Sequence, residues 1–458
     1  MSEQIAQFLS DFSSLAWGLP LLILLIGGGL YLGVLSGFKP IRLTGAAIRQ
    51  LVSSSGKSKS DDKNTLSPFQ ALSTALASTI GMGNIAGVAV AISIGGPGAI
   101  FWMWVSAVVG MITKFFTCSL VIMFKKRMED GTMEGGPMYF IEQGLGPKWK
   151  PLAMSFAVFG LVGAFPVFNV NQLTQATRDI LLIPSGITDS VSSNWAIGIF
   201  LTVLTGLVIL GGLQRIGKTS ERFVPGMVLL YFVSVLYIII THAAYLPETV
   251  RLIFSEAFAP THFKGSPFLG GALGGLILVG IRRGAFSNEA GIGTADLAHG
   301  ASNQPEPLRE GMSAMLGPLI DTLIVCTLTA MAILITGVWQ TSEANGVTLT
   351  LHAFEKGIPA IGSYVLLACI FVFSFSSLFS FSYYGTKCTA YLFGKKRAHY
   401  YQYIYLGSIL IGAITTLDMM INLIDGFYAL MAIPTMTGTI LLAPHVIRRL
   451  KDFKAEAG

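Results

Sequence analysis

The sequence predicts an all-α polytopic membrane protein whose chain crosses the bilayer eleven times. Of its 458 residues, 52% are hydrophobic and only 12% are charged, whereas about 25% of the residues in an average soluble domain are charged. Apolar runs of about 20 residues, the length needed to cross the hydrocarbon of a bilayer, recur along the chain. We expect transmembrane helices at residues 17–37, 67–93, 97–122, 150–177, 194–213, 223–243, 267–296, 309–338, 361–393, 401–417 and 422–445.

The positive charges predict how these helices are oriented. Most lysines and arginines fall in alternate loops, so the net charge of +6 fits membrane topology better than nucleic-acid binding. The intervening loops hold only Arg178, Arg251, Lys264 and Lys356. Since basic residues favour the cytoplasmic side, we expect the N-terminus outside and the C-terminus inside. No basic residue precedes the first apolar run, so we expect it to persist as a helix and not to be cleaved as a signal peptide.

The connecting segments are short. Residues 133–145 and 246–263 are amphipathic and predict surface helices, and the Ser/Lys/Asp-rich residues 53–64 predict a mobile cytoplasmic linker. The expected organisation is an N-terminal helix with its linker, a first five-helix unit, an external amphipathic connector, a second five-helix unit and a cytoplasmic tail, at residues 1–66, 67–243, 244–266, 267–445 and 446–458.

A similar short motif occurs near the start of each expected five-helix unit. Asn84-Ile-Ala-Gly87 lies in the second expected helix and Asn288-Glu-Ala-Gly291 in the seventh, and glycine precedes each motif. Because each unit has five spans, the second unit must run opposite to the first, which is an inverted-topology repeat. Glycine and polar residues at mid-span interrupt helical hydrogen bonding, which a bilayer tolerates only where the backbone lines a protein or water cavity.

An interrupted helix offers bare main-chain groups of both polarities. N–H groups at the start of one half-helix suit a carboxylate, and carbonyl groups at the end of the other suit a cation. A zwitterionic amino acid together with a sodium ion matches both. The alternative is that these glycines serve only close helix packing.

Several motifs resemble those of the alanine or glycine:cation symporter family, the sodium:alanine symporters. The segment Gly95-Gly-Pro-Gly-Ala-Ile-Phe-Trp-Met-Trp104 carries the resemblance, and further similar segments are Ser67–Ala71, Thr79–Gly87, Gly135–Tyr139, Arg283–Gly291 and Asp321–Cys326. The resemblance implies the leucine-transporter-type fold, with five plus five inverted spans and one extra N-terminal helix. It also implies sodium-coupled uptake of alanine, glycine or a similar amino acid across the cell (inner) membrane.

Four positions depart from the family pattern. Met82 stands where threonine is usual, Ala285 replaces a larger aliphatic residue, Phe381 replaces tryptophan and Thr386 replaces glutamate. Met82 exchanges a hydroxyl for a bulky, flexible thioether. These departures leave the exact substrate open.

The expected substrate site lies at mid-membrane between the second, fourth, seventh and ninth helices. Backbone N–H groups at Gly81, Met82 and Gly83 would hold the substrate carboxylate, with Thr79 and Asn84 bracing the turn. Carbonyl groups from Ile281 to Ala285 would hold the ammonium group, together with Asn169 and Gln172. The alternative for these two side chains is interhelical hydrogen bonding. The remaining expected site residues are Phe286 over the substrate side chain, Phe381 as a second wall or a core residue, and the polar Ser287 and Asn288 at the break.

Sodium prefers a small cage of hard oxygen ligands. By resemblance, the hydroxyl groups of Ser376 and Ser377 would complete a sodium site with carbonyl groups near Ser78 and Gly81. Serine in a membrane helix can instead donate back to its own helix.

Charged residues inside the expected spans call for partners, because an unpaired charge in the membrane is costly. We expect Glu289 to anchor Arg282 or Arg283 and so to hold the interrupted helix; if Glu289 titrates instead, the coupling ion is a proton. Lys114, Asp321 and Asp425 also call for pairing.

Other functional classes are less favoured. The sequence shows no repeated filter motif of an ion channel, and no paired carboxylates, histidine cluster or phosphate loop of an enzyme. The expected partners are therefore a small neutral amino acid, sodium and the lipid bilayer, with no prosthetic group. A proton-coupled carrier, or a carrier of another small zwitterion, is the main alternative.

Overall fold

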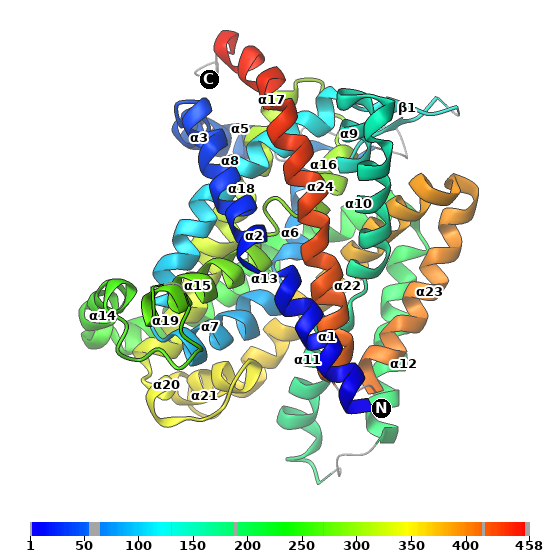
Figure 1. Cartoon of the computed structure of the whole chain (residues 1–458). Coiled ribbons are helices and arrows are strands. Elements are labelled where there is room, and N and C mark those ends of the chain that lie inside the picture. Colours follow the sequence, from blue (N-terminus) through cyan, green and yellow to red (C-terminus); the bar gives the residue numbers. More distant parts are fainter. Residues whose placement is uncertain are drawn as a thin grey trace.

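The computed structural model describes residues 2–54, 65–129, 131–186, 191–268, 270–414 and 417–453, and within these ranges the chain is almost entirely helical (Figure 1). The predicted linker 53–64 falls almost wholly outside the described residues. The named strands of the described chain are β1 (Lys126–Arg127) and β2 (Met133–Glu134), which pair antiparallel.

The first half of the chain forms the N-terminal helix and the first expected unit. Its helices are α1 (Ser2–Ala16), α2 (Leu19–Leu22), η1 (Ile23–Gly27), α3 (Gly28–Leu35), α4 (Lys39–Arg42), α5 (Thr44–Ser54), α6 (Pro68–Thr79), η2 (Gly83–Gly87), α7 (Val88–Gly95), α8 (Ala99–Met123), α9 (Pro137–Leu145), η3 (Pro147–Trp149), α10 (Lys150–Gly163), α11 (Val167–Thr177), η4 (Arg178–Leu182), α12 (Val191–Ile209) and α13 (Gly212–Thr241).

The second half begins with the connector and continues with the second expected unit. Its helices are η5 (Ala243–Tyr245), α14 (Leu246–Phe258), α15 (Ala272–Asn288), α16 (Thr294–Gly300), α17 (Pro307–Ala314), α18 (Leu316–Pro318), η6 (Leu319–Cys326), α19 (Thr327–Ile335), α20 (Val338–Thr341), α21 (Val347–Gly357), α22 (Gly362–Phe393), α23 (Lys395–Ile414) and α24 (Leu417–Asp452).

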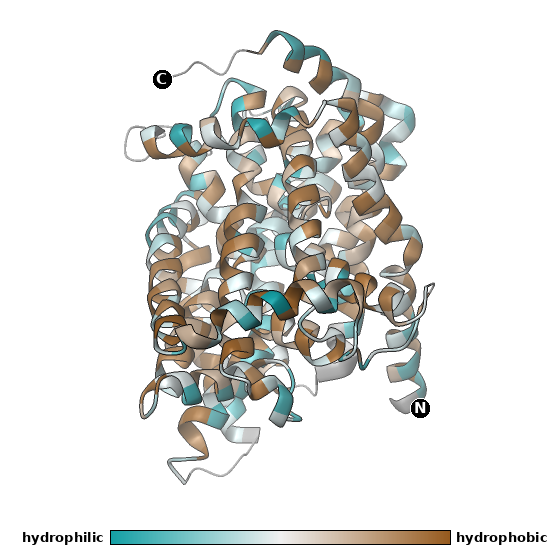
Figure 2. Cartoon of the chain, turned by 90° about the vertical axis from the view of Figure 1, so that its left-hand side faces the viewer, coloured by the Kyte–Doolittle hydropathy of each residue, from teal (hydrophilic) through white to brown (hydrophobic). Residues whose placement is uncertain are grey.

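Eight helices in the described chain are long and apolar enough to cross a membrane, and the bent pair α6 with η2–α7 makes a ninth. The two other expected spans, 267–296 and 401–417, correspond to α15 with α16 and to α23, which are also helical. Figure 2 shows apolar residues along the length of the long helices and hydrophilic residues gathered toward their ends. These helices agree with a multi-pass membrane protein, whereas eleven crossings remain a prediction.

Helix α6 lies at the centre of the bundle. It packs against α13, α16 and α22, and all ten residues from Gln70 to Thr79 are buried. Its start follows from the sequence: Ser67 and Gln70 form a capping box, in which each side chain accepts a hydrogen bond from the other residue's backbone N–H. A helix that is buried on all sides belongs to the interior of a bundle and does not face lipid.

Some predicted boundaries are wrong. The expected first span begins at Leu19, close to the predicted residue 17, but a further helix that was not predicted, α1, precedes it. Helix α13 begins at Gly212 and not at residue 223, so the basic residues near Arg215 extend that helix. Residues 133–145 do not form a surface helix, because α9 begins only at Pro137 and buries its first five residues against α10 and α24. The expected 246–263 helix is present as α14, and ends at Phe258.

Close packing of backbone on backbone gives a test of the fold. A side chain at Gly300 would place its Cβ 2.6 Å from the backbone of Gly135, whereas Gly407 in α23 has open space. We expect Gly300→Ala to lower the free energy of unfolding by about 1–3 kcal/mol through overpacking. Gly407→Ala should raise it by up to ~1 kcal/mol, since alanine favours helix. Unfolding midpoints in detergent measure both, and equal midpoints for the two variants would contradict the packing.

Candidate functional site

The first interrupted helix changes direction between Thr79 and Gly83. The axis bends by 54° between α6 and the η2–α7 segment, and Ile80 leaves the helical conformation with ψ of 89°. Gly81 is needed because of close approach: a Cβ there would lie 2.6 Å from Ser377 Oγ and 3.3 Å from Asn169 Oδ1. The interruption therefore sits against α22 and α11, the expected ninth and fourth helices.

The second interrupted helix has a different cause. Helix α15 ends at Asn288, and Glu289, Gly291 and Gly293 follow with φ of 55°, 82° and 102°. Glycine adopts this left-handed region at no steric cost, but a non-glycine residue such as Glu289 is strained there. Asn288 Oδ1 accepts a hydrogen bond from the Ala290 N–H at 3.0 Å and so stabilises the turn.

A third interruption was not predicted. The expected helix 150–177 is divided into α10 and α11 by residues 164–166. Pro166 is the signal that the sequence analysis passed over, since proline lacks an N–H and disfavours helix in the residue before it. Gly163 and Phe165, next to this break, both line the cavity described below.

One buried carboxylate joins the two predicted breaks. Asp321, in η6, accepts a hydrogen bond from Asn84 Nδ2 at 2.6 Å through Oδ1, and from Ser287 Oγ at 2.7 Å through Oδ2. Asn84 in turn accepts the Gly81 N–H at 2.9 Å. Thr322 also donates to Asp321, at 2.7 Å. The backbone turn of the first break and the end of α15 are thus tied to a single side chain.

A cavity of about 170 Å³ lies between the interrupted helices. This volume is below the roughly 300–1,000 Å³ of pockets for drug-sized ligands, so a small ligand fits it better. Eleven of the predicted site residues line it: Ser78, Thr79, Gly81, Met82, Gly83, Asn169, Arg282, Arg283, Phe286, Glu289 and Phe381. Asp425, which was expected to need a partner, also lines it, and the lining residues that were not predicted are Gly163, Phe165, Phe168, Asn422, Ile424 and Tyr428.

Other predicted site residues lie behind this lining. Asn84 and Ser287 belong to the Asp321 network, and Asn288 holds the second break. Gln172 is buried beside Gly346, and Ile281 faces a separate apolar groove formed with the N-terminal helix.

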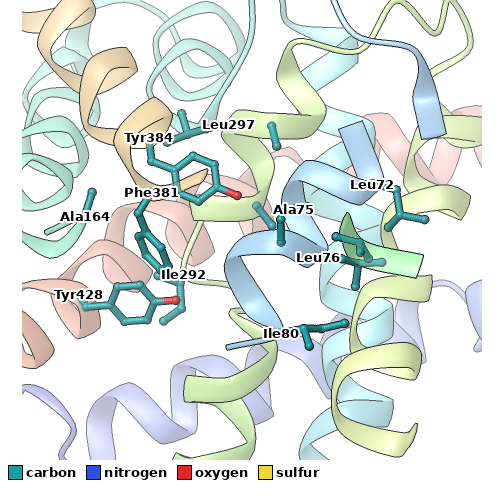
Figure 3. Packing of buried hydrophobic residues seen from close by; sticks show 14 of the residues in the cluster. Leu72, Ala75, Leu76, Ile80, Ala164, Ile292, Leu297, Phe381, Tyr384 and Tyr428 are labelled. Atoms are coloured by element: carbon teal, nitrogen blue, oxygen red, sulfur yellow. The ribbon is translucent and has the colours of Figure 1, made fainter. Parts of the chain in front are cut away.

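Aromatic rings surround one side of the cavity. Phe286 lies 6.0 Å from Phe168, 5.8 Å from Tyr428 and 6.4 Å from Trp17, measured between ring centroids. Figure 3 shows Phe381 between Tyr384 and Tyr428, with the Tyr384 hydroxyl directed toward α6, where it hydrogen-bonds with Ser78 Oγ at 2.8 Å. The apolar part of a ligand would therefore meet these rings.

The two serines assigned to a sodium site differ in geometry. Ser377 Oγ lies 3.3 Å from the Ala77 carbonyl and 3.2 Å from the Ser78 carbonyl, as well as 3.2 Å from its own helix at Phe373. Ser376 Oγ instead donates to the Phe373 carbonyl at 2.8 Å and contacts the Met227 sulfur. Both hydroxyl groups therefore donate within their own helix, and in the described chain that of Ser377 also lies beside two carbonyl groups of α6.

The charged residues pair differently from the prediction. Arg282 Nη2 forms an ion pair with Asp425 Oδ2 at 3.0 Å, and its guanidinium lies 5.6 Å from the centroid of Trp17. Glu289 accepts a hydrogen bond from Thr294 Oγ1 at 2.5 Å and hydrogen-bonds with Tyr428. The expected anchoring of an arginine by Glu289 is therefore wrong, because the left-handed turn at Glu289 carries its carboxylate to α16 and α24.

Interrupted helices around a small cavity with polar and aromatic walls are the features of a secondary transporter, which binds its cargo near the bilayer midplane. Comparison with known proteins agrees. Over 85% of this chain and 99% of the other, the fold matches that of MhsT, solved in complex with L-phenylalanine, with a TM-score of 0.56 at 13% identity. This likeness supports the leucine-transporter-type fold.

The sequence matches the sodium:alanine symporter family over residues 2–457. The sodium/alanine symporter AgcS of Methanococcus maripaludis is 37% identical, over 96% of this chain and 95% of that protein. The probable sodium/glutamine symporter GlnT of Bacillus subtilis is 32% identical, over 99% and 91%. The chain belongs to the sodium:alanine symporter family, which is a family of transporters and not of enzymes, and it is a multi-pass cell-membrane protein.

The Asp321 network gives a test of how the breaks are joined. Asp321→Ala should lower the free energy of unfolding by about 3 kcal/mol or more, because it leaves buried donors without an acceptor. Amide hydrogen exchange should quicken in residues 80–84 and 287–293 together. Thr322→Val is the matched control, since it removes one donor and leaves both ties intact. Faster exchange at only one break would contradict a shared anchor.

Proposed function

We propose that the protein carries a small neutral amino acid, alanine or glycine first among candidates, together with sodium, by alternating access. The observation that supports this most directly is the cavity bounded by both interrupted helices. Bare main chain at mid-membrane is tolerated where it lines a cavity, and a zwitterion offers groups that complement it.

The proposed sodium site lies at the end of α6. The carbonyl oxygens of Ala77 and Ser78 and the hydroxyl of Ser377 approach one another, and hard oxygen ligands of this kind suit a hard cation. Sodium is a transported ion here, and its binding would hold α22 against the first interrupted helix.

The walls of the cavity bear on the choice of substrate. Phe286, Phe381 and Met82 present apolar surface, so the proposed substrate carries a short uncharged side chain. AgcS is named for alanine and GlnT for glutamine, and a larger neutral amino acid is therefore the second candidate. Proton coupling through Glu289, which lines the cavity, is the alternative to sodium.

The arrangement in the membrane follows from the same proposal. Residues 67–243 and 267–445 would form the two inverted repeats, each opened by one interrupted helix, and the helix of residues 4–35 would be the additional span. With the N-terminus outside and the C-terminus inside, α1 would lie toward the outer face of the inner membrane.

Uptake into proteoliposomes tests the coupling ion. At fixed pH, an inward sodium gradient should drive L-alanine accumulation, and replacing sodium with choline should reduce the initial rate at least about tenfold, the effect of ~1.4 kcal/mol of coupling. Undiminished uptake in choline would refute sodium coupling. If uptake in choline then follows an imposed proton gradient, the coupling ion is a proton.

Adjacent serines give a matched test of the sodium site. Ser377→Ala removes a hydroxyl ligand and should raise the half-saturating sodium concentration about tenfold, corresponding to a hydrogen-bond-sized loss of ~1.4 kcal/mol. Ser376→Ala should leave it nearly unchanged, because that hydroxyl is directed to its own helix and to the Met227 sulfur and not to the carbonyl groups of α6. Equal effects of the two variants on sodium dependence would remove Ser377 from the site.

A further inference from the structure

Four charged side chains line the cavity, and three of them already have partners. Arg282 is held by Asp425 and by the face of Trp17. Asp425 Oδ2 also accepts a hydrogen bond from Ser13 Oγ at 3.0 Å. Glu289 is engaged by Thr294 and Tyr428.

Arg283 is the remaining charge. It lines the same cavity, but it forms no hydrogen bond or ion pair with any residue in the described part of the chain. The Asp425 carboxylate attracts the Arg283 guanidinium electrostatically, but Asp425 already forms an ion pair with Arg282. An unpaired guanidinium inside a membrane bundle is costly. Such a group is explained if an anion reaches it during the transport cycle, since guanidinium presents five donors in a fork that matches a carboxylate.

The main-chain donors expected to bind the carboxylate are partly occupied. The Gly81 N–H donates to Asn84 Oδ1 at 2.9 Å, and the Met82 N–H donates to Asn169 Oδ1 at 3.3 Å. Both acceptors are neutral amides that tie the break to its neighbours. Within the described cavity wall, Arg283 is therefore a cationic donor that has no protein acceptor.

The placement of Arg283 also suits a small amino acid. Arg283 and Phe286 are three residues apart on α15, so they lie on neighbouring parts of one helix face. A ligand whose carboxylate reaches Arg283 would direct its side chain toward the ring cluster of Phe286.

We propose that Arg283 is a substrate-binding residue whose guanidinium receives the carboxylate of the transported amino acid. This assignment rests on the proposed function. Arg283 then has a partner only when the ligand is bound, whereas Arg282 pairs with Asp425.

A ligand–variant cycle tests the assignment. The probes are L-alanine and L-alaninamide, which differ in the carboxylate, and the dissociation constants of both are measured in sodium with purified wild-type protein and Arg283→Gln. Wild type should prefer L-alanine by about 10- to 100-fold, the size of a charge-assisted hydrogen bond. Arg283→Gln should reduce that preference to about threefold or less and change the affinity for alaninamide little. An unchanged preference would overturn the assignment.

A second measurement needs no variant and covers the case in which Arg283→Gln fails to fold. Phenylglyoxal modifies accessible arginines, and peptide mass spectrometry reports the extent at each site. L-alanine should protect Arg283 of the wild-type protein and L-alaninamide should not, with Arg282 as the internal comparison. Equal modification of Arg283 with and without L-alanine would overturn the assignment while leaving alanine binding itself standing. If the wild-type protein binds no neutral amino acid, both the proposed function and this assignment are overturned.

Discussion

The arrangement of the site depends on the hydrogen bonds that converge on the Asp321 carboxylate. Asn84 and Ser287 reach it from two interrupted helices that lie about 200 residues apart in the chain, and each bond to a charged group contributes about 1.5–3 kcal/mol. Without such ties, the non-helical turns would expose main-chain groups to a medium that cannot hydrogen-bond them. The carboxylate therefore makes it possible for two breaks to share one cavity wall.

The additional N-terminal helix takes part in the same site. α1 and α24 run side by side (Figure 1), and both Ser13 and Trp17 donate hydrogen bonds to Asp425, one to its carboxylate and one to its carbonyl. Asp425 then holds Arg282 of the second interrupted helix. A segment outside the proposed repeats thus helps to set the position of α15, and through it the shape of the cavity.

The sequence predicted most of the helices and both breaks, because these features depend on local patterns of residues. The apolar runs located the helices, and the Gly- and Asn-containing motifs located both breaks, since backbone conformation and burial follow from nearby residues. Asn169 and Phe381, identified by resemblance, also line the cavity. Pro166 is also a local signal, because proline favours a break in the helix, but the predicted span 150–177 did not take it into account.

What the sequence could not provide was the choice of partner among several of equal chemistry. Glu289 and Asp425 were both suitable partners for Arg282, and the outcome depended on the left-handed turn at Glu289, which directs its carboxylate to Thr294. Trp17 appeared only as the start of an apolar run, because its contact with Phe286 joins residues far apart in the chain.

The most direct test of the account is the structure of the protein with L-alanine and sodium bound, determined in a lipid nanodisc. The account predicts ligand density in the cavity between Gly81–Gly83 and Phe286, with Asn84, Ser287 and Asp321 still joined behind it. Continuous helices through residues 79–83 and 288–293, or ligand bound elsewhere with this cavity filled by side chains, would contradict it.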